Sequence, residues 1–263
     1  AAADFNLAYT YRESVDETHY AIHLADLLAD ERSVIVTVGF MMHDFTQAQA
    51  AAHPDVYFIG VDQAFDAAPP NLVGLQFRED QGGFLAGALA GMMTESGTVA
   101  VLGGEAVPPV ERFVNGYVNG VQYTNSSARV LEAYAGSFVD APAGQQIARG
   151  WVEDQQVDVI FGAAGLTGSA AIFEAAGRGA WVIGVDQDEY RTTFNDGALD
   201  GAARLLTSAI KRVDVGVYQA IDSILNGTFT SGVLTLSAAD CGIGYADWHD
   251  AAADIPAPVK TRL

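Results

Sequence analysis

Cysteine and lysine are nearly missing from this chain. Among its 263 residues there are one cysteine, Cys241, and two lysines, Lys211 and Lys260. A single cysteine excludes an intrachain disulfide, so the fold must rest on its apolar core. We expect Cys241 to be a small buried residue rather than a nucleophile, because no Cys–His pattern surrounds it.

Long apolar runs are missing as well. None approaches the roughly 20 residues that a helix needs to cross a bilayer. The first residues, Ala-Ala-Ala-Asp-Phe, have neither the basic nor the apolar region of a signal peptide, so we expect no such peptide in this chain. This start fits either a cytoplasmic protein or one from which a leader has been removed.

Positive charge is scarce. The chain has 13 Lys and Arg against 33 Asp and Glu, a formal net charge of −20. Such an acidic surface repels phosphate backbones and anionic lipid, so we expect no direct binding of nucleic acid. The acidity is either an adaptation to salt or a result of genomic composition.

Apolar residues and chain length are ample. Half of the residues are hydrophobic and 17% are charged, which predicts a globular protein with a sizeable core. The length is sufficient for two domains of ordinary size.

Short apolar runs alternate with amphipathic stretches along most of the chain. We expect strands at 5–11, 33–38, 56–61, 72–77, 98–102, 130–135, 157–161 and 181–185. We expect helices near 18–30, 80–94, 109–123, 144–154 and 167–177, and a further helix over 208–226 that ends at Asn226-Gly227. Apolar strands alternating with helices predict an α/β fold with parallel sheets covered on both faces.

A five-residue sequence occurs twice. Ile59-Gly60-Val61-Asp62-Gln63 recurs as Ile183-Gly184-Val185-Asp186-Gln187, each time at the end of an apolar strand. We interpret the repeat as two similarly wound lobes, with a crossing near 92–98. Lobe one would hold residues 1–96 and 208–230. Lobe two would hold 97–207 and 231–263.

The ends of the expected strands carry glycines and acidic residues. In open parallel sheets, ligands bind beyond the carboxyl ends of the strands. Those ends here are 39–44, 62–63, 103–105, 162–165 and 186–188. Glycine lets a backbone approach a ligand closely, and carboxylates accept hydrogen bonds. The set therefore favours sugar hydroxyls and base N–H groups over phosphate.

Several strand-end residues have a purely structural alternative. Asp44 either contacts a ligand or caps the helix that we expect to begin near Phe45. Asp62 is best interpreted as structural. Asp186 and Asp188 resemble a metal pair, but no third and fourth ligand lie at useful spacing, so we expect no metal.

Lys211 and Phe138 also have two interpretations. Lys211 is either a solvated residue at a helix start or the partner of a carboxylate such as Asp186, with which it would hold vicinal hydroxyls. Phe138 follows a strand, and its sequence context alone favours a core residue over a stacking surface.

Catalytic patterns are missing. The chain has no Gly-x-Ser-x-Gly, no His-Glu-x-x-His and no Cys–His pairing. His19 and His23 share a helix face but lack a third ligand. We therefore predict no catalytic residue, no metal and no cofactor.

Seven segments, in order and spanning nearly the whole chain, are similar to the basic membrane protein family of bacterial lipoproteins, which includes the purine nucleoside receptor A type. They are 37–44, 59–62, 103–105 with 110–117, 134–140, 163–168, 182–188 and 206–211. The resemblance implies a type I periplasmic-binding-protein fold, with two Rossmann-like lobes joined by a hinge. It also implies a solute-binding protein that delivers a nucleoside to an ABC permease.

The resemblance also implies a site and a location. Asp44 would recognise the purine edge, Phe138 would stack on the base, and the backbone of Gly165 would lie against the ligand. Asp186 and Lys211 would hold the ribose hydroxyls. The protein would be extracytoplasmic and held at the membrane only through a lipid anchor that this chain lacks.

Family members begin with a strand, a loop carrying a second aromatic residue, and a helix. We expect this unit of about 40 residues to be missing from this chain, which would then begin at the second strand, 5–11. Two alternatives to transport are a ligand-sensing domain of the same fold and an enzyme such as a nucleoside hydrolase. The enzyme needs a metal-binding Asp cluster, which the sequence does not offer.

Overall fold

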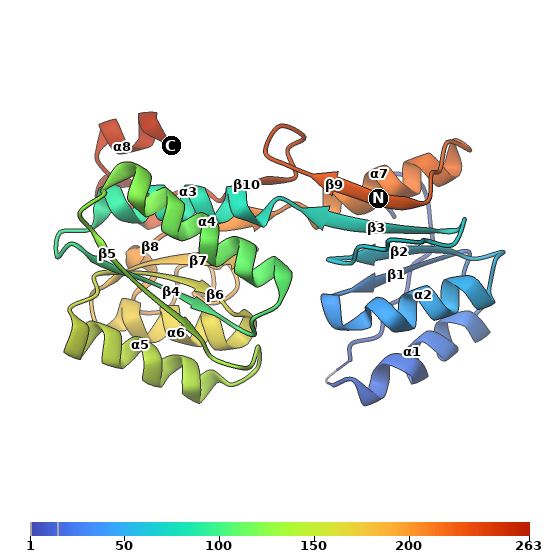
Figure 1. The fold of residues 1–263 in the computed structure, drawn as a ribbon, viewed down its shortest axis with the longest axis horizontal. Coiled ribbons are helices and arrows are strands. Elements are labelled where there is room, and N and C mark those ends of the chain that lie inside the picture. Colours follow the sequence, from blue (N-terminus) through green and yellow to red (C-terminus); the bar gives the residue numbers. More distant parts are fainter. Residues whose placement is uncertain (1, 15) are drawn as a thin grey trace. The chain divides into compact units, whose positions relative to one another are not determined.

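The chain folds into two compact α/β units in the computed structural model, which describes residues 2–14 and 16–263 (Figure 1). Unit 1 comprises Ala1–Phe77 and Arg212–Gly242, and unit 2 comprises Arg78–Lys211 and Ile243–Leu263. Within the described ranges, no helix is both long and apolar enough to span a membrane.

Unit 1 is built on a four-stranded parallel sheet with the order β1-β2-β3-β9. Its strands are β1 (Val34–Val38), β2 (Tyr57–Val61), β3 (Leu72–Phe77) and β9 (Gly232–Leu236). Its helices are α1 (Thr18–Ala29), η1 (Phe40–Met42), α2 (His43–Ala52) and α7 (Val213–Leu225). Figure 1 shows α1 and α2 below the sheet and α7 above it, so both faces are covered.

Unit 2 contains a six-stranded sheet with the order β10-β8-β7-β6-β4-β5. The strands are β4 (Thr98–Gly103), β5 (Arg129–Tyr134), β6 (Val159–Ala163), β7 (Trp181–Asp186), β8 (Leu205–Lys211) and β10 (Ile243–Tyr245). All neighbours are parallel except β10, which runs antiparallel to β8. The carboxyl ends of β4 to β8 therefore lie at one edge of the sheet.

Helices cover both faces of the unit 2 sheet. They are α3 (Glu79–Met93) and α4 (Pro108–Thr124) on one face, and α5 (Ala141–Gln155) and α6 (Gly165–Gly177) on the other (Figure 1). The short elements η2 (Ala202–Arg204), η3 (His249–Ala253) and α8 (Ala257–Arg262) complete the unit. The inner strands β4, β6, β7 and β8 are almost continuously buried, as expected for parallel strands between two helix layers, whereas the edge strand β5 is partly exposed along its length.

Helices α3 and α4 cross with their backbones in contact. A Cβ atom added at Gly87 of α3 would lie 2.0 Å from the carbonyl oxygen of Tyr117, and one at Gly120 of α4 would lie 2.1 Å from that of Phe84. Only glycine leaves room for such an approach. The glycines therefore fix how the two helices lie against each other.

Most of the expected elements are confirmed, but two are wrong. Residues 5–11 are not a strand, since Asn6 and Leu7 instead form turn hydrogen bonds to Ala3 and Ala2. Residues 208–211 belong to strand β8, and the helix begins only at Val213. An apolar run of this length suits a strand or a helix equally, and pairing with β7 decides the outcome.

Three further expectations differ from the structure. The expected strands end at 181–185, whereas the structure also contains β9 and β10 further along the chain. Cys241 is exposed rather than buried. The unit boundaries fall at 77/78, 211/212 and 242/243 rather than at 96/97, 207/208 and 230/231. The first boundary differs most because α3 packs on α4 and β8 and so belongs to unit 2.

Candidate ligand-binding site

Asp186 and Lys211 meet at the carboxyl edge of the unit 2 sheet. Asp186 ends β7 and is paired in register with Ile210, so Lys211 follows on the neighbouring strand. The Lys211 Nζ atom lies 3.5 Å from Asp186 Oδ1. The Lys211 side chain is only 5% exposed, whereas that of Asp186 is 54% exposed. The carboxylate therefore faces solvent while most of the lysine is buried.

Asp186 has an uncommon backbone conformation. Its φ of 65° lies in the left-handed region, where residues other than glycine are rare. The buried Glu189 supports this turn, since its Oε1 accepts a hydrogen bond from the Val185 amide at 3.2 Å. The Glu189 amide in turn donates to Ser208 Oγ of β8 at 3.0 Å. A backbone held this firmly in a sparsely populated region is a feature typical of functional sites.

Burial raises the pKa of the Glu189 carboxyl above its usual range, while hydrogen bonds from Thr193 and Ser169 lower it. The carboxylate that supports the Asp186 turn is thus harder to ionise than an ordinary glutamate.

Lys211 has charged and aromatic neighbours in addition to Asp186. Its Nζ atom lies 5.9 Å from the centre of the Phe113 ring. Its positive charge also acts on Glu79, the buried first residue of α3, whose Oε2 accepts a hydrogen bond from Arg112 Nε at 2.7 Å. Sequence reasoning assigned no role to Glu79 or Arg112. The feature of the sequence that points to Glu79 is its position as the first residue of a helix made mostly of apolar residues and glycine.

Phe138 and Gly165 are brought together at the same edge. The Phe138 ring is half-buried against Gly104, where an added Cβ would lie 2.4 Å from two ring carbons. A Cβ at Gly165 would lie 3.1 Å from the Phe138 carbonyl oxygen, which also accepts a hydrogen bond from the Thr167 amide. The segment after β5 and the start of α6 therefore form one packed surface.

Asp44 lies in unit 1, whereas the other four predicted site residues lie in unit 2. It is the second residue of α2, which begins at His43, and its carboxylate is 95% exposed. The capping interpretation is wrong, because no side chain caps this helix and Asp44 Oδ1 instead bonds with His43 Nδ1 at 2.8 Å. A carboxylate in the first turn still interacts favourably with the helix dipole.

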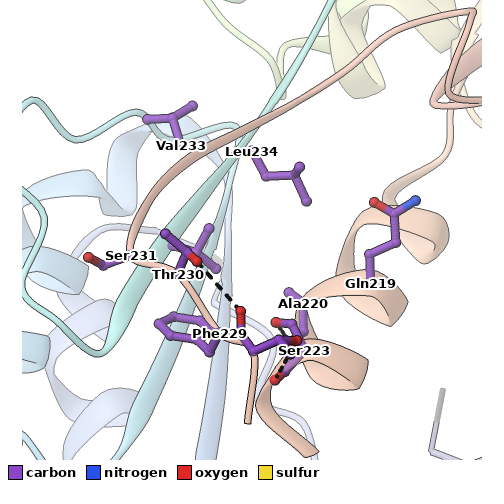
Figure 2. A pocket seen from close by; sticks show the side chains of 10 residues that line it. Gln219, Ala220, Ser223, Phe229, Thr230, Ser231, Val233 and Leu234 are labelled. Atoms are coloured by element: carbon purple, nitrogen blue, oxygen red, sulfur yellow. Dashed lines mark hydrogen bonds between the residues drawn. The ribbon is translucent and has the colours of Figure 1, made fainter. Parts of the chain in front are cut away.

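Unit 1 also contains a cavity of about 310 Å³ between α7 and the segment that leads into β9 (Figure 2). Figure 2 shows Gln219, Ala220 and Ser223 of the helix on one side and Thr230 on the other. The Ser223 hydroxyl already donates to the Ala220 carbonyl at 2.7 Å. None of the five predicted ligand residues lines this cavity.

The fold is the type I periplasmic-binding-protein fold. A solute-binding protein of an ABC transporter system from Aeropyrum pernix K1 matches it with a TM-score of 0.79 and 28% identity, over 94% of this chain and 69% of that one. Residues 1–253 match the Bmp family, described as "ABC transporter substrate-binding protein PnrA-like". The chain belongs to this family, as its resemblance to basic membrane proteins predicts.

Two relatives in sequence illustrate the membership. The CD4+ T-cell-stimulating antigen of Listeria monocytogenes is 33% identical over 234 residues, 85% of this chain and 64% of the relative. An uncharacterized lipoprotein of Pyrococcus horikoshii is 33% identical over 233 residues, 82% of this chain and 55% of the relative. The chain thus spans less than two thirds of the length of these two proteins.

Proposed function

We propose that the protein binds a nucleoside, preferably a purine nucleoside, and delivers it to the permease of an ABC importer. The observation that carries the proposal is the ion pair of Lys211 and Asp186, at 3.5 Å, on the carboxyl edge of a parallel sheet. An ion pair of one cation and one carboxylate suits a neutral ligand with hydroxyl groups better than a phosphate.

The ion pair would hold the ribose. The Asp186 carboxylate accepts hydrogen bonds from hydroxyl groups, and the Lys211 ammonium donates hydrogen bonds to the hydroxyl oxygens. Because the two groups are already paired at adjacent strand ends, little order has to be created when the ligand arrives. Vicinal hydroxyls, such as those at the 2′ and 3′ positions, match two neighbouring groups of opposite charge.

The base would stack on Phe138. Its ring is supported from behind by the backbone of Gly104, so it forms a rigid apolar surface. Gly165, packed beside it, would present its backbone to the ligand. Asp44 would accept a hydrogen bond from an N–H group of the purine, a role that its exposed carboxylate allows.

Delivery to a permease and an extracytoplasmic, lipid-anchored location complete the proposal. They are supported by the family description and by the Pyrococcus horikoshii relative, which is named a lipoprotein. A receptor of this kind binds its ligand without converting it, so we assign no reaction to the site.

A calorimetric titration of the full-length protein tests the binding proposal. Purine nucleosides should bind more tightly than uridine, and free bases or ribose should bind weakly or not at all, because each engages only half of the site. Binding should also raise the melting temperature, because the ligand stabilises only the folded state. Lys211→Met should abolish most of the affinity.

The chain offers a matched control in its other lysine. Lys260 lies in α8 and donates to the carbonyl of Ala252, so Lys260→Met removes a lysine of the same unit without touching the strand edge. Unchanged affinity in Lys211→Met, or no binding of any nucleoside by the folded protein, would overturn the proposal.

A further inference from the structure

Lys211 requires compensation for its charge because its side chain is almost completely buried. Its partner Asp186 is 54% exposed, so solvent weakens the attraction between them. A ligand that binds the carboxylate would compete for the same oxygens. The positive charge acts on a second carboxylate, that of Glu79, whose side chain is almost completely buried.

Glu79 is an unusual residue to bury. Its side chain is only 1% exposed, and its Oε2 accepts the 2.7 Å hydrogen bond from Arg112. Within the described part of the chain, its Oε1 has no hydrogen-bond partner although it is fully buried. A buried carboxylate oxygen without a donor is costly, so its presence demands an explanation other than local hydrogen bonding.

Opposite charges surround this carboxylate. Burial raises the pKa of Glu79, while the Arg112 hydrogen bond and the charges of Lys211 and Arg112 lower it. Arg112 pairs with Glu79 at 2.7 Å and Lys211 pairs with Asp186 at 3.5 Å, while the ring of Phe113, the residue after Arg112, lies 5.9 Å from Lys211 Nζ.

The α3–α4 crossing holds this arrangement rigidly. Glu79 begins α3, whereas Arg112 and Phe113 are consecutive residues of α4. A Cβ added at Gly83 would lie 2.2 Å from the Phe113 carbonyl oxygen, so the two helix backbones touch beside these residues. Lys211 Nζ therefore lies 5.9 Å from an aromatic ring of a fixed helix pair, and the residue preceding that aromatic residue holds the buried Glu79 carboxylate.

We propose that Glu79, held by Arg112, is a positioning residue that fixes the Lys211 ammonium at the ligand edge and balances its charge. Asp186 is then available to accept hydrogen bonds from the ligand, because Lys211 keeps a counter-charge that the ligand cannot reach. The inference rests on the proposed function for its ligand, but the electrostatic influence of Glu79 on Lys211 is testable without one.

The first experiment is a double-mutant cycle on the full-length protein. The variants are Glu79→Gln, Lys211→Met and the double variant, each titrated with adenosine and with 2′,3′-dideoxyadenosine. Glu79→Gln should weaken adenosine binding by about tenfold, a coupling in the range measured for neighbouring charged groups. It should affect the dideoxy analogue much less, and it should have no further effect once Lys211 is Met.

Glu174→Gln is a matched control. Glu174 of α6 pairs with Arg149 and Arg178 away from the strand edge, so its loss removes ion pairs without touching Lys211. It should leave both affinities unchanged. If Glu79→Gln does not fold, Glu79→Asp retains the charge on a shorter side chain and should give a smaller effect with the same dependence on the hydroxyls.

The second experiment needs no ligand. With only two lysines in the chain, ¹³C-dimethylation gives resolved NMR signals for Lys211 and Lys260. Removing a nearby carboxylate favours loss of the lysine proton, so Glu79→Gln should move the titration of the Lys211 signal to lower pH and leave that of Lys260 in place.

The outcomes separate the two proposals. No nucleoside binding together with a shifted Lys211 titration contradicts the proposed ligand but supports the positioning role. An unshifted titration, or equal and additive losses for both ligands, shows that Glu79 serves stability alone and overturns the inference.

Discussion

Each of the two units contains a turn of the same sequence, but different side chains support the turn in each unit. Strands β2 and β7 both end in Ile-Gly-Val-Asp-Gln, and both aspartates are left-handed, with φ of 62° at Asp62 and 65° at Asp186. Each turn is supported by a buried polar side chain that lies over the strand glycine. A Cβ at Gly60 would lie 2.4 Å from Gln63 Oε1, and one at Gly184 would lie 2.8 Å from Glu189 Cγ.

The supporting side chains differ in charge and in direction of hydrogen bonding. Gln63 is neutral, and its Nε2 donates to the Gly39 carbonyl at 3.0 Å and to Thr37 Oγ1 at 3.1 Å. Glu189 is acidic and accepts from the Val185 amide of its own strand. The neighbouring strand differs too, since Gly60 pairs with Gly74 whereas Gly184 pairs with Ser208. The same backbone turn is therefore preserved while its chemistry has diverged.

The largest expected difference between the turns is in ligand affinity. Asp186→Asn removes the charge that we propose accepts hydrogen bonds from the ligand hydroxyls. It should weaken nucleoside binding by about 1.5–3 kcal/mol, the usual range for a hydrogen bond to a charged group, since solvent already weakens its pairing with Lys211. Asp62→Asn, at the matching position of unit 1, should cost far less. Calorimetric titration of both variants measures the difference, and equal losses would mean that the two turns serve the ligand alike.

A smaller effect is expected from replacing Gly74, the strand partner of Gly60, by the residue type found at the matching position of unit 2, Ser208. Gly74→Ser introduces the Ser208 side chain into unit 1, where a Cβ would lie 2.2 Å from the Gln63 carbonyl oxygen. Because that contact is with backbone, we expect a loss of stability of about 1–3 kcal/mol. Denaturant unfolding measures it, with Gly150→Ser as the control because a Cβ there has nothing closer than 3.9 Å.

The smallest expected effect is a pH dependence specific to unit 2. The pKa of Glu189 is raised on folding, so its contribution to stability is fully present below the ordinary value of 4.5 and is lost as pH rises through the raised pKa. The stability of the natural protein relative to Glu189→Gln should therefore fall as pH rises across that window. Urea unfolding of both proteins at several pH values tests this, and a constant difference would contradict it.

Much of the fold could be predicted because its elements are strongly patterned. Helices such as α4 and α5 carry proline in their first turn and have a clear apolar face, and strands such as β6 are continuous apolar runs. Strand β8 could not be predicted, since Leu205–Lys211 becomes a strand through its pairing with β7 and β10. Residues 5–11 show the converse, because an apolar alternation does not form a strand without a neighbour.

The candidate site was predictable to a similar extent. The sequence suggested that Lys211 pairs with a carboxylate such as Asp186, and the structure contains that ion pair. The residues beneath it were not predictable. Glu79 and Arg112 are 33 residues apart in the chain and meet only because glycines let two helices touch. Whether the five site residues bind a nucleoside stays a prediction.

The chain crosses between the two units three times, after Phe77, Lys211 and Gly242. Lys211 is therefore the last residue of unit 2 before one crossing, and Glu79 is the second residue after another. The third crossing returns the chain at Ile243, which pairs directly with Lys211. All three connections between the units therefore lie within two residues of Lys211 or Glu79, either along the chain or, for Ile243, in strand register.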